Sequence, residues 1–420
     1  MPMSPEFKNR LSPILDKIVH TFGTPFHIYD ETGINQTCET LNLAFEKIKG
    51  FKEYFAVKAL PNPTIMTLLK TNGFGFDCSS IPELTLSRNI GSKGEDIMFT
   101  SNNTSVHQFE AAMDQGGAIL NLDDISLISK LPQIPELICF RYNPGAKRTG
   151  NKIIGNPMEA KYGVTHAQLL DAYKRSMDLG VKRFGIHTML ASNELDYTYM
   201  METADMLLAI IQEIHETLGI QFEFINIGGG LGIPYTPDTP NFDLSAMAAG
   251  VTRSFEAFKK QNGWVPKLYM ESGRYITGPH GALVTSVINH KETYRNYVGV
   301  DASMSALMRP GMYEAYHHIH IHGKEDATPL KKVDVVGALC ENNDKFAIQR
   351  DLPTTTEGDI LVIHDTGAHG HAMGFNYNGH LRPKELLLKK DGSVELIRRA
   401  ETMEDYFTTL NFEPKTMAAV

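Results

Sequence analysis

Between about residue 50 and residue 275, short apolar runs alternate with longer amphipathic segments. The runs have the length of strands and are rich in β-branched and aromatic residues, while the segments between them have the length and periodicity of helices. This repeated order predicts parallel strands joined by helices, an α/β fold. We identify eight candidate strands: Tyr54–Ala59, Gly75–Ser79, Ile97–Thr100, Ala118–Leu122, Leu137–Tyr142, Phe184–Met189, Phe224–Ile227 and Lys267–Glu271. Eight such units predict a (β/α)8 barrel, in which functional side chains lie at the carboxyl ends of the strands.

The pattern changes after about residue 275. Segments such as GALVTSVINHKETY and GDILVIHDTG are β-rich, are separated by turn signals and do not alternate with helices. They predict a second, mainly β domain, a Greek-key-like barrel or sandwich. Because Pro25–Tyr29 is typical of a strand that could join it, we expect a barrel over residues 31–275 and a discontinuous β domain formed by residues 1–30 and 276–420.

Composition narrows the class of protein. The 420 residues are 42% hydrophobic and 21% charged, as in ordinary globular proteins, and the net charge is -9. An acidic chain without a Lys/Arg-rich run disfavours nucleic acid and anionic membranes as partners. The first residues do not resemble a secretory signal, no apolar stretch is long enough to span a membrane, and the four cysteines are scattered. We therefore expect a reduced cytoplasmic enzyme without structural zinc.

Polar or glycine residues lie at or just after the ends of six candidate strands. A lysine at a barrel rim would be partly desolvated, which favours a neutral amine that can form a Schiff base, although a solvated charge is the commoner role. These residues are Lys58, Asp77, Arg141 with Asn143, His187, Gly228–Gly230 and Glu271.

Two of these strand ends suggest an anion and a ring nitrogen as ligands. The glycines Gly228–Gly230 let backbone N–H groups converge on an anion such as phosphate, or else form only a tight turn. Glu271 could hold a pyridinium nitrogen protonated while Arg274 pairs with a phosphate or carboxylate, or the two could form a simple ion pair.

Two further segments carry reactive residue types. In ALCENNDKF, Cys340 stands beside Glu341, and carboxylates near a thiol favour a proton donor, or a merely buried cysteine, over a nucleophile. In HHIHIH the histidines alternate along a strand without an accompanying carboxylate, which favours a polar or partner-facing surface over a metal site. The histidines are His317, His318, His320 and His322.

Taken in order, these segments resemble the fold-type III pyridoxal phosphate (PLP) decarboxylases, the alanine-racemase-like barrels that include diaminopimelate, ornithine and arginine decarboxylases. The resemblance extends from PFHIYD through YFAVKA, GFGFDCSS, FGIH, INIGGGLGIPY, MESGRY, MRPGMYEAYH and LCENND to GDILVIHDTGAHG. It implies a Schiff base between PLP and Lys58. It also implies a homodimer with shared active sites, in which Cys340 is the proton donor and, with Glu341, completes the partner's site. The other residues expected at the cofactor are Asp77, His187, Met189, Ser192, Gly228, Gly229, Gly230, Glu271, Arg274 and His369.

Within the family, RPGMY resembles the diaminopimelate branch, whose matching arginine and tyrosine bind the distal amino-acid end of the substrate. A second carboxylate needs a fixed, bidentate cation, whereas a simple diamine precursor needs an acid there. We therefore expect decarboxylation of meso-diaminopimelate to L-lysine. The residues expected at the substrate are Arg274, Arg309, Tyr313, Glu341 and His369.

Three residues depart from the family pattern. Met189 stands where a histidine stacks on the cofactor ring, His369 replaces a tyrosine, and Ser272 replaces a proline. These changes keep open a decarboxylase of another amino acid: ornithine or lysine, a carboxy-polyamine, or a carrier-tethered amino acid. A silent PLP-binding or regulatory homologue is a third alternative, disfavoured because Lys58, Glu271, Arg274 and Cys340 are all present.

Overall fold

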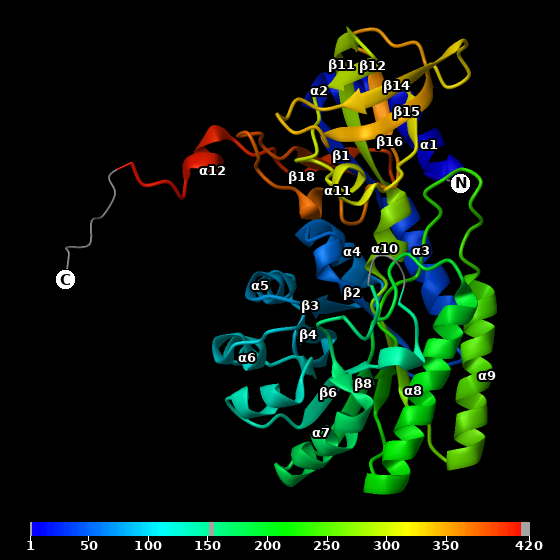
Figure 1. Ribbon diagram of the computed structural model, residues 1–420, viewed down its shortest axis with the longest axis vertical. Coiled ribbons are helices and arrows are strands. Elements are labelled where there is room, and N and C mark those ends of the chain that lie inside the picture. The colour runs from blue at the N-terminus through cyan, green and yellow to red at the C-terminus, as the bar shows by residue number, and fades with distance from the viewer. Residues whose placement is uncertain (1, 151–154, 413–420) are drawn as a thin grey trace.

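The computed structural model describes residues 2–150 and 155–412 and contains a closed barrel in its lower part in Figure 1. Its strands run in the order β5-β4-β3-β2-β10-β9-β8-β6, and β5 pairs with β6 to close the ring of eight parallel strands. The predicted (β/α)8 barrel is therefore confirmed. The strands are β2 (Lys52–Ala56), β3 (Gly75–Cys78), β4 (Ile97–Ser101), β5 (Ile119–Leu122), β6 (Leu137–Asn143), β8 (Arg183–His187), β9 (Phe224–Asn226) and β10 (Lys267–Met270), with the short β7 (Val164–Thr165) paired to β6.

Helices surround the barrel and bury their apolar faces against it. Neighbouring strand residues alternate between two clusters: Phe55 packs toward the helices, while Tyr54 joins a separate cluster made by barrel strands alone. Most of these helices begin at a side-chain cap, as where Asn62 accepts from the Thr64 N–H before α4. The helices are α3 (Glu31–Ala44), α4 (Pro63–Thr71), α5 (Ile81–Asn89), α6 (Val106–Met113), α7 (His166–Asp178), α8 (Tyr197–Leu218), α9 (Leu244–Asn262) and α10 (Gly273–Thr277).

A separate mixed sheet of nine strands stands above the barrel (Figure 1). Its central strand β1 comes from the amino-terminal part of the chain and lies between β11 and β17, with Phe26 opposite both Val284 and Lys384. The expected strand at Pro25–Tyr29 therefore joins this sheet. The strands are β1 (Phe26–Asp30), β11 (Gly281–Glu292), β12 (Asn296–Val300), β13 (Ile319–Ile321), β14 (Leu330–Val336), β15 (Lys345–Pro353), β16 (Ile360–Ile363), β17 (Lys384–Leu388) and β18 (Val394–Arg398).

Short helices complete this part of the chain: α1 (Pro5–Leu11), α2 (Leu15–Phe22), α11 (Arg309–Tyr313) and α12 (Met403–Phe407). The domain division at residues 30 and 275 stays a prediction, and residues 1 and 413–420 of its second part lie outside the described residues. No helix within residues 2–150 and 155–412 is long and apolar enough to cross a membrane.

The largest difference from the predicted strands concerns Lys58. Sheet pairing ends at Ala56, opposite Asp77, and the next three residues, Val57–Ala59, form one turn of 3-10 helix. The chain has to leave the barrel here to reach α4, and the Leu60 N–H closes this turn on the Val57 carbonyl at 3.1 Å. Lys58 therefore stands on a turn above the strand end, with an exposed side chain, instead of being desolvated within the strand.

Candidate active site

A cavity of about 830 Å³ lies where the carboxyl ends of the barrel strands meet the part of the chain that follows residue 275. Such a volume suits a cofactor together with a small substrate. The cavity brings together nine residues singled out from the sequence: Lys58, Met189, Ser192, Gly230, Glu271, Arg274, Arg309, Tyr313 and His369.

The remaining expected residues lie outside its lining. Asp77 and His187 are buried, with His187 Nε2 3.3 Å from Glu271 Oε2. Gly228 and Gly229 belong to the same turn as Gly230. Cys340 is exposed in the loop between β14 and β15, where its N–H donates to Asn378 Oδ1 at 2.7 Å, and Glu341 follows it. Neither Cys340 nor Glu341 lines the cavity of its own chain.

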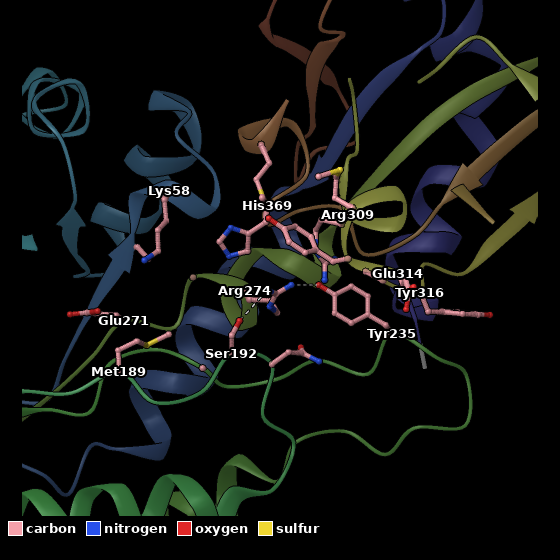
Figure 2. Close-up of a pocket in the computed structure, with 18 residues that line it drawn as sticks. Lys58, Met189, Ser192, Tyr235, Glu271, Arg274, Arg309, Glu314, Tyr316 and His369 are labelled. Atoms are coloured by element: carbon pink, nitrogen blue, oxygen red, sulfur yellow. Dashed lines mark hydrogen bonds between the residues drawn. The ribbon is translucent and has the colours of Figure 1, made fainter. Parts of the chain in front are cut away.

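The cavity has two chemically different ends, which Figure 2 shows. Lys58, Met189 and Glu271 lie at the left of the view, while Arg309 and Tyr235 lie at the right. Arg274 and His369 lie between these groups. We call the two groups the lysine end and the arginine end.

Glu271 is an ionised carboxylate at the lysine end. Burial acts to raise its pKa, but His187, followed by Lys58 and the Asn226 amide, brings it below the ordinary value. The Asn226 amide donates to Glu271 Oε1 at 2.7 Å. Neighbouring Asp77 behaves oppositely, because burial and the charge of Glu271 raise its pKa well above the ordinary value. The pKa values of these two neighbouring carboxyl groups are therefore shifted in opposite directions.

The glycine turn after β9 packs its backbone against neighbouring loops. A Cβ on Gly229 would lie 2.2 Å from the Glu271 carbonyl oxygen, and one on Gly230, whose φ is +113°, would lie 2.7 Å from the Ala191 carbonyl oxygen. Only glycine fits so close an approach. The turn is tied to Glu271 through Asn226, whose Oδ1 accepts from the Gly228 N–H at 2.9 Å.

The two unusual residues both take defined places. The Met189 sulfur lies 3.2 Å from the Gly229 nitrogen. His369 has a left-handed backbone, with φ +56°, and its N–H donates to the Ala59 carbonyl at 2.9 Å, which fixes it close to the turn that carries Lys58. Burial, and after it the charges of Arg274, Lys58 and Arg309, holds the pKa of His369 well below its ordinary value. This ring is therefore neutral.

Sequence reasoning gave no role to several residues of the site, among them Glu314 and Tyr316 in the cavity lining and three that contact the residues described above. Asn226 was hidden as one polar residue in an apolar strand, and Tyr235 stood at the end of the glycine segment without a recognised role. Tyr235 receives a hydrogen bond from Arg274 Nη1 at 2.5 Å and lies with its ring 4.7 Å from the Arg309 guanidinium. His317 was grouped with the other histidines, but its side chain contacts Arg309.

The other histidines of that segment lie away from the cavity. The rings of His318 and His320 pack against His364, at 4.9 and 4.8 Å between centroids. Within the described part of the chain, no group of three or more His, Cys, Asp or Glu side chains has an arrangement that could hold a metal ion.

Comparison with known proteins identifies the family. The sequence pattern described as "Pyridoxal-dependent decarboxylase, pyridoxal binding domain" matches residues 32–278. The chain belongs to this family. This decarboxylase is 37% identical over 396 residues to the diaminopimelate decarboxylase of Methanothermobacter thermautotrophicus, with 93% of this chain and 92% of the relative covered. It is 47% identical over 414 residues to Protein TabA of Pseudomonas amygdali pv. tabaci, with 99% and 97% covered.

Comparison with solved structures leads to the same family. The crystal structure of diaminopimelate decarboxylase from M. jannaschii superposes with a TM-score of 0.88 at 29% identity, covering 95% of this chain and 94% of that one. The enzyme from Helicobacter pylori, crystallised with L-lysine, gives 0.85 at 28% identity and covers 94% and 98%. The decarboxylase is therefore a PLP-dependent enzyme of the diaminopimelate decarboxylase type.

The residues present fit PLP on structural grounds. The lysine end offers an exposed amine at Lys58, an ionised carboxylate at Glu271 for a ring nitrogen, and a glycine turn that no side chain can fill.

Proposed function

We propose that this decarboxylase converts meso-diaminopimelate to L-lysine and CO₂. The observation that carries the proposal is Arg309, a guanidinium that is only 6% exposed yet lines the arginine end, across the cavity from Lys58. A cation so placed suits a substrate with a carboxylate far from the reacting carbon. The names of the relatives and of the superposed structures support the same substrate.

Lys58 would hold PLP covalently, Glu271 would face its ring nitrogen, and the glycine turn, Ser192, Arg274 and His369 would line the rest of its site. When bound, PLP supplies an electron sink for the pair of electrons left by departing CO₂. Glu271, whose pKa is lowered, would accept a hydrogen bond from a protonated ring nitrogen and would favour that protonated form. Neutral His369 adds no further positive charge beside Arg274 and Lys58.

The last step returns a proton to the α-carbon. In our proposal Cys340 of a second subunit donates it, and Glu341 beside it reaches the distal amino group of the substrate. Exposure of Cys340 at the surface of its own chain supports this arrangement, because the described residues that line the cavity include no cysteine. The proposed functional unit is therefore a homodimer with shared active sites.

A second candidate is decarboxylation of another amino acid. Met189 and His369 favour it, because both depart from the family pattern and both line the cavity. The 47% identity to Protein TabA, a name that states no substrate, also leaves the specificity open. Ornithine, lysine, a carboxy-polyamine or a carrier-tethered amino acid are the alternatives.

An activity panel with one variant tests the proposal. CO₂ release would be measured from meso-diaminopimelate, D- and L-lysine and ornithine, for the parent and for Arg309→Ala. Removing a guanidinium from a distal carboxylate costs about 2–5 kcal/mol, so kcat/KM for diaminopimelate should fall roughly 30- to several-thousand-fold. D-Lysine, which lacks a distal carboxylate, should change much less.

Arg253→Ala is the matched control, because this arginine is exposed on α9, away from the cavity. If the kcat/KM of Arg309→Ala for diaminopimelate stays within about threefold of the parent value, a difference below 1 kcal/mol, Arg309 does not bind a distal carboxylate. The second candidate then takes precedence.

A further inference from the structure

His317 is a fully buried histidine beside the arginine end of the cavity. Its Nδ1 lies 2.7 Å from the carbonyl oxygen of His364, and its Nε2 lies 2.7 Å from Arg309 Nη1. A carbonyl oxygen can only accept a hydrogen bond, and a guanidinium can only donate one. Nδ1 therefore carries the ring proton and donates it to His364, while Nε2 of the neutral ring accepts from Arg309.

The surroundings of His317 keep it in this neutral form. Burial, and after it the charge of Arg309, lowers the pKa of His317 well below its ordinary value. A protonated ring would point an N–H at the N–H of the guanidinium, so the two groups would repel each other. The hydrogen bond to Arg309 therefore exists only with the neutral histidine.

The partners of both cavity arginines are uncharged. Arg274 donates to the Tyr235 hydroxyl at 2.5 Å and to Ser192 Oγ at 3.4 Å. Arg309 faces the Tyr235 ring, against which the His317 ring packs edge-on at 5.1 Å. Neither Arg274 nor Arg309 is among the arginines that form ion pairs with carboxylates in residues 2–150 and 155–412. Neither guanidinium therefore forms an ion pair with a carboxylate of the described residues, although the charge of Asp365 acts to raise the pKa of Arg309 and Glu314 lines the same cavity.

We propose that His317 is a positioning residue that aims Arg309 into the cavity through an uncharged acceptor and so leaves the guanidinium charge for an anionic group at the distal end of the substrate. A carboxylate at position 317 would orient Arg309 equally well, but it would neutralise the guanidinium and compete with the substrate anion. The inference rests on the proposed function and deepens it, since it explains how a buried arginine remains available to a distal carboxylate.

Two variants of equal length separate orientation from charge. His317→Gln keeps a neutral oxygen acceptor near the position of Nε2, whereas His317→Glu supplies a charged one. With saturating PLP, we expect the KM for meso-diaminopimelate to stay within about fivefold of the parent in the Gln variant and to rise at least about 30-fold in the Glu variant. The kcat of each should change far less than its KM.

Two controls exclude a general loss of structure. D-Lysine, measured as substrate or competitive inhibitor, lacks the distal carboxylate, so its affinity should differ by less than about threefold between the Gln and Glu variants. His322→Gln alters a histidine of the same segment that contacts Asp16, at 3.5 Å, and should behave as the parent. If the Glu variant binds diaminopimelate as well as the Gln variant does, the inference is wrong.

Nitrogen-15 NMR of labelled histidine gives a second measurement that needs neither substrate nor variant. The ring that shows contacts to the Tyr235 ring protons should be neutral, with its proton on Nδ1, at pH 6 and above. A cationic ring, or one protonated on Nε2, would overturn the inference. Should the parent not act on diaminopimelate, the proposed function fails, and this NMR result decides separately whether His317 accepts from Arg309.

Discussion

Glu53 is a buried carboxyl group directly behind the active site. It is 1% exposed, its Oε1 accepts a hydrogen bond from the Ser272 N–H, and its Oε2 has no partner in the described parts of the chain. Burial first, and then the charge of Glu271, raises its pKa to about 8, although the Ser272 N–H acts against this. Proline, which the family pattern has at position 272, lacks an N–H. The hydrogen bond to Glu53 therefore depends on the serine that replaces it.

This raised pKa makes stability depend on pH. Between the unfolded value near 4.5 and the folded value of about 8, Glu53 is protonated when folded and ionised when unfolded. The folded state binds the extra proton, so the free energy of unfolding falls as pH rises through this window. Glu53→Gln removes the titration and should therefore gain stability over the parent between pH 5 and pH 8, on the order of 3 kcal/mol.

Thermal unfolding of both proteins at pH 5 and pH 8, with PLP held constant, measures this gain. Glu256→Gln, which changes an exposed residue of α9, should show none. A difference between parent and Glu53→Gln that is the same at the two pH values would contradict a neutral Glu53.

At the scale of single residues, sequence reasoning succeeded where the residue type itself carries the chemistry. Lys58, Glu271, Arg274 and Arg309 were all expected at one site, and all line one cavity. It failed for His317, because alternation along a strand says which residues share a face but does not say that β13 begins only at Ile319, so that His317 precedes it and contacts Arg309.

At the scale of elements, the glycine turn after β9 is the most restrictive part of the site. The nearest atom to a Cβ on Gly229 would be a backbone oxygen at 2.2 Å, which cannot rotate away as a side chain can. Gly229→Ala should therefore push the turn away from the end of β10, cost about 1–3 kcal/mol of stability and weaken PLP binding.

Equilibrium dialysis of PLP, together with thermal unfolding, tests this expectation. Gly299→Ala is a suitable control, because its Cβ would come no closer than 3.3 Å to another atom and lies on β12, outside the cavity. Parent-like PLP affinity in Gly229→Ala would mean that the turn can relax.

All eight predicted barrel strands exist in the structure, and their ends differ by a few residues at most. Apolar runs are enough to find such strands, because each is buried on both faces. The ends are harder to predict, since pairing stops where a neighbouring strand stops. The strand predicted to include Lys58 is an example. Pairing between β2 and β3 ends at Ala56, and nothing in the local sequence indicates this end.

At the scale of the whole molecule, the proposal that Cys340 completes the site of a second subunit can be tested directly. Two inactive variants, Lys58→Ala and Cys340→Ala, would be mixed under conditions that allow subunit exchange. If each site takes its lysine and its cysteine from different chains, heterodimers regain one intact site, and about a quarter of the parent activity should return at statistical mixing.

Each variant incubated alone is the control and should stay inactive. Absence of recovery, after exchange has been verified by mass spectrometry of tagged subunits, would place both residues of a site on one chain. The sequence could suggest this arrangement only through the family resemblance, because no pattern within one chain encodes where a second copy binds.

The pairing of β1 with β17 also has a consequence for synthesis. Phe26 finds its partner at Lys384, so at about 5–20 residues per second the ribosome needs roughly 20–70 s to deliver the second half of that contact. During this time the barrel can fold, while the apolar side chains of Phe26 and Ile28 still lack their final neighbours. Until β17 has been made, β1 can pair only with β11, so the nascent enzyme passes through a stage in which one edge of this central strand is open to other chains.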